Sequence, residues 1–142
     1  MILWDVNLWV YAFRPDSPLH EPAYNELQTT LVRREPFIFL PNVAASFLRL
    51  VTNPRIFRSP SALDEAWHFI DILEEHPAAF HADVDTMTFG IFKHLCLLSS
   101  ASGNEIPDVL LAASAIRHDA TFCSADRGFS RFPALRFSLL DK

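Results

Sequence analysis

The sequence predicts an α/β fold, a three-layer α/β/α sandwich around a central, mostly parallel sheet. Short apolar runs of strand length alternate along the chain with longer segments whose apolar residues recur at helical spacing. This alternation implies crossover connections between parallel strands, which place helices on both faces of the sheet. Because the chain has 142 residues and half of them are hydrophobic, we expect one domain, residues 1–142, with a well-packed core.

The first half of the chain is expected to contain two strands and two helices. An apolar run at 2–4 predicts the first strand, a Pro-Asp-Ser-Pro turn follows, and a helix is expected from about residue 20 to 31. Residues 37–40 predict the second strand. The next helix is expected from Val43 to about Thr52, where Asn53-Pro54 ends it because a residue before proline disfavours the α conformation.

The second half continues the same pattern. Ser61 is the expected N-cap of an amphipathic helix that reaches residue 73, with acidic residues in its first turn. The remaining elements are predicted from apolar spacing alone. They are a short strand at 78–82, helices at 86–98 and 109–118, and strands at 121–124 and 136–139.

Composition limits the classes of function. The formal net charge of −5 argues against a protein that coats nucleic acid by charge alone, yet ten of the 12 basic residues are arginines. Arginine pairs well with phosphate, although a compositional bias explains the ratio equally well. Cys96 and Cys123 form no C-x-x-C motif, and no apolar run approaches the length of a membrane span. We therefore expect a cytoplasmic protein with reduced thiols and no membrane association.

Three acidic residues fall where strands end or helices begin. Asp5 follows the first strand, Asp126 follows the strand at 121–124, and Asp108 opens a helix after Ile106-Pro107. In a parallel sheet these positions meet at one edge, where each negative charge raises the pKa of the others unless a cation is present. Mg²⁺ or Mn²⁺ would suit such a site, which could then hydrolyse a phosphodiester. Helix capping and turn formation are the alternative roles for each residue.

Four segments in order give the chain a resemblance to a known family. They are 2–8, 46–55, 103–113 and 124–133, and through them nearly the whole chain resembles the PIN-domain ribonucleases, within these the VapC-type toxins of bacterial toxin–antitoxin pairs. The resemblance implies that Asp5, Asp108 and Asp126 bind the metal and that Asn7 and Ser124 support them. Ser46 departs from the pattern, because many members of the family carry a glutamate there.

The resemblance also implies an activity and its partners. We expect a Mg²⁺-dependent endoribonuclease, with Mn²⁺ as a substitute, that cuts transfer RNA or another structured RNA and leaves a 5′-phosphate and a 3′-hydroxyl. A homodimer is expected, as is a VapB-like antitoxin that folds into a groove and inserts a basic residue among the acids. Possible contacts to RNA phosphates are Arg49, Arg55, Arg127 and Arg131, for which ion pairs with the protein's own acids are the alternative.

Two rival hypotheses come from the same residues. Without a glutamate at Ser46, the chain is alternatively a weakened PIN module that binds antitoxin or RNA and does not cut, unless Glu105 compensates. A phosphatase that uses Asp5 as nucleophile is poorly supported, because Asn7 cannot donate a proton as a carboxylic acid does. Aromatic residues such as Trp9, Phe13 and Phe69 are more consistent with core packing than with base stacking.

Overall fold

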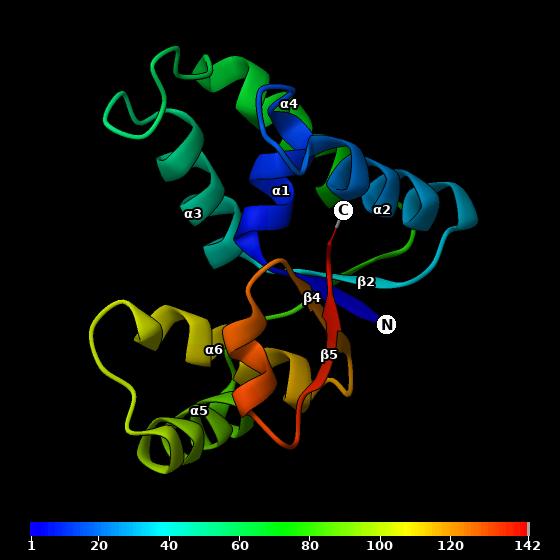
Figure 1. Ribbon diagram of the computed structural model, residues 1–142. Helices are drawn as coiled ribbons and strands as arrows, with labels where there is room; N and C mark the ends of the chain where they lie inside the picture. Colours follow the sequence, from blue (N-terminus) through cyan, green and yellow to red (C-terminus); the bar gives the residue numbers. More distant parts are fainter. Residues whose placement is uncertain (142) are drawn as a thin grey trace.

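A computed structural model describes residues 1–141 and contains the predicted parallel sheet (Figure 1). Its strand order is β3-β2-β1-β4-β5, and every neighbouring pair of strands is parallel. The strands are β1 (Ile2–Trp4), β2 (Phe37–Phe39), β3 (Ala79–His81), β4 (Thr121–Ser124) and β5 (Arg136–Leu139). β2 is buried at all three positions, which explains why its sequence is continuously apolar rather than alternating.

Helices cover both faces of this sheet, as predicted. They are α1 (Val6–Phe13), α2 (His20–Arg33), α3 (Pro41–Val51), α4 (Leu63–Glu74), α5 (Thr86–Ser99), α6 (Glu105–Arg117) and the 3₁₀-helix η1 (Arg127–Arg131). Figure 1 shows α1 to α4 on one side of the sheet and α5 and α6 on the other. Within residues 1–141 no helix is long and apolar enough to span a membrane.

The topology creates a crevice beside the first strand. The chain moves outward from β1 to β2 and β3, then returns to the other side of β1 and forms β4 and β5. β1 and β4 are therefore paired at the point where the strand order reverses. The segments that follow these two strands diverge from their carboxyl ends, and open α/β sheets bind ligands at this position.

Three helix starts differ from the prediction. α3 begins at Pro41 rather than at Val43, because proline is tolerated at the first helical position. α6 begins at Glu105 rather than at residue 109, because Pro107 is accommodated in the first turn, where its missing N–H would have no partner in the helix. Asp108 is therefore a first-turn residue and not a cap. Ser61 is also not the N-cap of α4. Ala62 occupies that position, and the Ser61 hydroxyl accepts a hydrogen bond from Arg14 at 2.9 Å.

No helix was predicted between the first strand and the Pro-Asp-Ser-Pro turn, whereas the structure has the helix α1 there. Leu8, Trp9, Val10 and Ala12 are all buried, so α1 lacks the polar face that gives a helix its sequence period. Trp9 and Phe13 pack against Phe47 of α3 and Phe69 of α4, with ring centroids 5.3–6.1 Å apart. This cluster confirms core packing for these aromatic residues and fixes α1 against α3.

Candidate active site

Asp5 is the central acidic residue at the β1–β4 crevice. It follows β1 directly, its backbone N–H donates to the Cys123 carbonyl of β4 at 2.9 Å, and only 4% of it is exposed. The Ser124 hydroxyl donates to Asp5 Oδ2 at 2.6 Å and accepts from the backbone N–H of Asp126 at 3.0 Å. The fully buried Ser124 thus joins the segments that follow the two strands.

The charge of Asp5 is poorly compensated in the folded chain. The pKa of the Asp5 carboxyl is raised from 3.8 to about 6, mainly by burial and also by the charges of Asp108 and Asp126, although the Ser124 hydrogen bond lowers it. The pKa of Asp108 is also raised, first by burial and then by Asp126. The three acids predicted from the sequence therefore lie near enough to influence one another. A bound cation would relieve this repulsion.

Asp126 has two structural features beyond its charge. It is exposed, it forms the N-cap of η1, and its Oδ1 accepts from the Gly128 N–H at 2.8 Å. A Cβ at Gly128 would lie 3.0 Å from that oxygen and 3.2 Å from Arg131 Nη1, so a larger residue there would crowd both side chains. The capping role that the sequence offered as an alternative is therefore present, and it uses one carboxylate oxygen.

Asp108 opens onto a groove between α3 and α6. The groove has a volume of about 390 Å³, and its walls include Ser46 and Arg49 from α3 and Asn104 and Asp108 from the start of α6. Ser46 therefore lies on the wall opposite Asp108, where a glutamate side chain would reach into the same space. Asp108 and the exposed Arg49 both line this groove.

The donor atoms around Asp5 suit a hard cation. Asn7 is the second residue of α1, and its side-chain Oδ1 is buried without a hydrogen-bond partner among the described residues. Together with the carboxylates it gives a set of oxygen donors, which Mg²⁺ and Mn²⁺ prefer. Within residues 1–141 no three His, Cys, Asp or Glu side chains are gathered closely enough to hold one ion together. The arrangement fits an ion held by one or two carboxylates and water, as is usual for Mg²⁺.

The candidate RNA-binding arginines fall into two groups. Arg131 contacts the protein itself: Nη1 donates to the Gly128 carbonyl at 2.6 Å, Nη2 lies 3.7 Å from Glu105 Oε2, and the guanidinium stacks on Phe132. Glu105 is thus the partner of an arginine. The other three candidates are exposed and form no ion pair with any acid of residues 1–141; they are Arg49, Arg55 and Arg127.

Tyr11 lies near the acids and was not among the site residues predicted from the sequence. Burial raises the pKa of its hydroxyl, and the charges of Asp5 and Asp126 raise it further. The spacing between Asn7 and Tyr11 could have indicated this position from the sequence. Tyr11 follows Asn7 by four residues, and residues at that distance share one face of a helix.

Comparison with known proteins agrees with this fold. The PIN domain model matches residues 2–135, so the chain belongs to the PIN-domain family. Within that family it groups with the VapC ribonucleases, the toxins of toxin–antitoxin pairs. It is 39% identical to the VapC ribonuclease Mb2897 of Mycobacterium bovis over 137 residues, which cover 96% of this chain and 93% of that protein. This relationship favours the ribonuclease over the non-cleaving module.

Solved structures show the same fold at lower identity. VapBC2 from Rickettsia felis, crystallised with a DNA fragment from its promoter, matches with a TM-score of 0.72 and 20% identity, covering 99% of this chain and 100% of that one. VapC20 from Mycobacterium tuberculosis, a toxin that cleaves the sarcin–ricin loop, has a TM-score of 0.67 and 12% identity, covering 96% of this chain and 98% of that one.

Proposed function

We propose that this chain is a Mg²⁺-dependent endoribonuclease that cuts transfer RNA or another structured RNA in the cytoplasm, with Mn²⁺ able to replace Mg²⁺. The buried and poorly compensated Asp5 carries the proposal, because Asp108 and Asp126 add further negative charge beside it. A protein without a cation-dependent activity gains nothing from such an arrangement, since like charges destabilise one another.

Each side chain of the site has a defined task in this proposal. Asp5, Asp108 and Asp126 would hold the ion, one or two of them directly and the rest through water, and the Ser124 hydroxyl favours the ionised form of Asp5 by donating to it. When bound, the ion supplies Lewis-acid polarisation of phosphate and a water of lowered pKa. The free Oδ1 of Asn7 is suited to accept a hydrogen bond from water at the site. The hydroxyl of Tyr11 stays protonated, because its raised pKa keeps it a donor.

RNA selectivity in this proposal depends on how the substrate is held. Hydrolysis by activated water does not need the 2′-hydroxyl, so preference for RNA requires contacts to its shape and backbone. The groove between α3 and α6 begins at Asp108 and contains Arg49, which is exposed and free to meet a phosphate. Cleavage of a ribosomal RNA loop by VapC20 makes a folded RNA the natural first substrate to test.

Cleavage of total cellular RNA tests this function. The chain, freed of antitoxin, is incubated with RNA and Mg²⁺ or Mn²⁺, and new 5′ ends are mapped. We expect cuts at a few sites, with 5′-phosphate ends, that disappear in EDTA. Cleavage that persists in EDTA, or folded protein that cuts nothing over a wide range of enzyme concentration, would contradict the proposal.

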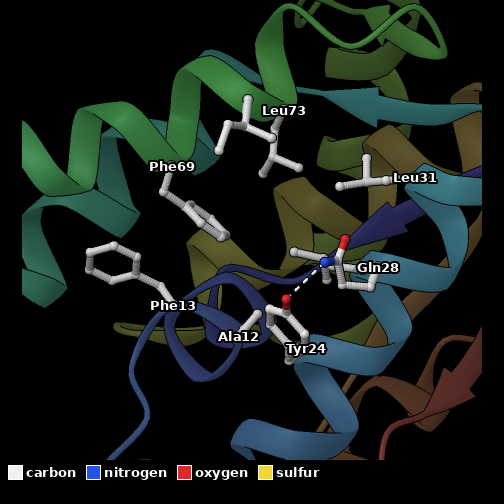
Figure 2. A pocket seen from close by; sticks show the side chains of 9 residues that line it. Ala12, Phe13, Tyr24, Gln28, Leu31, Phe69 and Leu73 are labelled. Carbon is white, nitrogen blue, oxygen red and sulfur yellow. Dashed lines mark hydrogen bonds between the residues drawn. The ribbon is translucent and has the colours of Figure 1, made fainter.

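We propose that the VapB-like antitoxin binds in the apolar pocket shown in Figure 2. It has a volume of about 310 Å³ and lies among α1, α2 and α4, with Phe13, Leu31, Phe69 and Leu73 among its walls. At the rim the Tyr24 hydroxyl accepts a hydrogen bond from the side-chain amide of Gln28 at 2.8 Å. A helix or extended segment with apolar anchors would fill such a pocket.

A charge placed at the rim of this pocket should weaken antitoxin binding. Ile72 lines the pocket and is 49% exposed, so Ile72→Asp should keep the fold while forcing a carboxylate against the apolar anchor. We expect at least about tenfold weaker antitoxin binding by calorimetry, or about 1.4 kcal/mol, with RNA cleavage unchanged. Val32→Asp at the 79% exposed Val32 of α2 is the matched control. If both variants weaken antitoxin binding equally, this pocket is not the antitoxin-binding site.

A homodimer is proposed through the outer face of α5. This face exposes several large apolar side chains, namely Met87, Phe89, Leu97 and Leu98. Apolar patches of this kind mark association surfaces. Light scattering of the purified chain should give twice the monomer mass, and a monomer at micromolar concentration would contradict the proposal.

Ser46→Glu should strengthen metal binding if the missing carboxylate limits it. The new side chain would enter the groove that Asp108 lines, where a further negative oxygen donor is available to a cation. We expect affinity for Mn²⁺ to rise on the order of tenfold, or about 1.4 kcal/mol, with faster cleavage at low metal concentration. Ser46→Gln has the same length without the charge. Identical Mn²⁺ affinity for the two variants would show that the three aspartates are sufficient for metal binding.

A further inference from the structure

The connection between α3 and α4 is a closed loop that carries two arginines. Its ends meet where the Ser61 N–H donates to the Val51 carbonyl at 2.8 Å. The Asn53 side chain accepts from the backbone N–H of Arg55 at 2.9 Å and so shapes the first turn of the loop. Arg58 lies in the second half of the loop, and both arginines are exposed.

Arg14, far away in the sequence, holds this loop in place. It follows α1, and only 8% of it is exposed. Its Nη1 donates to the Ser59 carbonyl at 2.8 Å and to the Ser61 hydroxyl at 2.9 Å. Its guanidinium carbon lies 4.0 Å from the centroid of the Phe57 ring. Arg14 thus contacts both sequence neighbours of Arg58.

The orientation of Arg14 is itself fixed. Asp16 accepts two hydrogen bonds from it in a fork, at 3.0 Å from Nε and 2.7 Å from Nη2. A charge with so little exposure is costly unless its donors are satisfied, and lysine cannot reproduce this planar fork together with the stacking contact. Arg14 contacts only the loop and the turn that follows α1 among the polar and aromatic contacts described above. These contacts therefore hold the loop in position.

The loop belongs to a basic stretch of the chain that begins with α3. Residues 41–63 contain Arg49, Arg55 and Arg58 and no Asp or Glu, in a chain whose formal net charge is −5. These arginines form no ion pair with an acid of residues 1–141. Arg49 lines the groove that begins at Asp108, and the loop continues from the end of the same helix. The positive charge therefore extends from the groove along α3 and into the loop.

We propose that Arg14 is a positioning residue for RNA binding, which clamps the 53–61 loop against the end of α1 so that Arg55 and Arg58 meet RNA phosphates. This inference rests on the proposed ribonuclease function. Arg14 does not touch the RNA and acts through the loop. A loop that is already fixed loses less conformational entropy when it binds the RNA phosphates, so binding is tighter.

A double-mutant cycle in the Asp108→Asn background, which keeps RNA intact, tests this role. The probe is unfractionated transfer RNA, and affinity is measured over a range of salt concentrations. Arg14→Lys should weaken binding about three- to tenfold, and Arg55→Ala combined with Arg58→Ala should also lower the salt slope by about 2. When the two loop arginines are already removed, Arg14→Lys should have no further effect. Arg33→Ala, at an exposed arginine of α2 outside this region, should leave binding unchanged.

Independent measurements separate positioning from a general loss of structure. In Arg14→Lys, amide hydrogen exchange should accelerate in residues 53–61 and stay unchanged in β1 and β4. In the active chain, Arg14→Lys should raise KM and leave kcat within about twofold, because the acids are untouched. Ser61→Ala removes one acceptor of Arg14 and should shift exchange and KM in the same direction by less.

The outcomes distinguish this inference from the function on which it rests. If Arg14→Lys weakens binding equally with and without the loop arginines, or if the loop exchanges faster with no change in affinity, the positioning role is wrong and the ribonuclease proposal stands. If removing Arg55 and Arg58 leaves affinity unchanged, the positioning role is likewise wrong. A wild-type chain that neither binds nor cuts RNA contradicts both.

Discussion

Asp108→Asn is expected to abolish RNA cleavage while leaving the fold intact. The substitution keeps the size of the side chain and removes its charge from the groove beside Asp5 and Asp126. Loss of several kcal/mol of charge stabilisation in the transition state corresponds to a fall in kcat/KM of at least about 100-fold. The measurement is the initial rate of cleavage of one RNA identified among the cut sites, in saturating Mg²⁺.

Stability must be compared in the same experiment. Burial and the charge of Asp126 raise the pKa of Asp108, which outweighs its favourable place in the first turn of α6, so removing the charge should not lower stability at neutral pH. Asp71→Asn on α4 is the matched control, since Asp71 makes no side-chain hydrogen bond or ion pair within residues 1–141. An Asp108→Asn chain that retains a tenth of the wild-type rate would remove Asp108 from the site.

The position of the acids was predictable because it follows from topology. Strand length, apolar content and the alternation with helices indicated a parallel sheet, and the carboxyl ends of parallel strands share an edge. Asp5 and Asp126 follow neighbouring strands, β1 and β4, and therefore meet at the strand-order reversal. Local sequence was sufficient for these two residues, since each follows its strand within a few positions.

Other features depend on contacts that a local pattern does not contain. The helix α1 is buried on nearly all sides by α2 and α3, so its sequence has no polar face to reveal it. Pro107 resembles a helix stop, and only the geometry of the first turn makes it part of α6. Ser61 has the sequence of an N-cap, but its hydroxyl is bound by Arg14, which is 47 positions away. These differences arise because tertiary contacts outweigh local preference.

Asp5→Asn is expected to stabilise the metal-free protein while it eliminates cleavage. The pKa of Asp5 is higher in the folded chain, at about 6, than its ordinary 3.8, so the folded state binds this proton more tightly. Wild-type stability should therefore fall as the pH rises from about 4 to about 6 and stay low above that. Asparagine carries no charge and still accepts from Ser124 through Oδ1. At pH 7.5 the variant should gain about 1–3 kcal/mol, at 1.36 kcal/mol for each pKa unit.

Urea unfolding in EDTA at several pH values between 4 and 7.5 measures this effect. The advantage of Asp5→Asn over the wild type should be largest at pH 7.5 and close to zero at pH 4, where the wild-type carboxyl is protonated in the folded state. Asp71→Asn should show no such pH dependence. Adding Mn²⁺ should stabilise the wild type and leave the variant unchanged, because a ligand stabilises only the state that binds it. A variant less stable than the wild type at pH 7.5 in EDTA would mean that the Asp5 charge is already compensated within the chain, and the argument for a cation at this edge of the sheet would then fail.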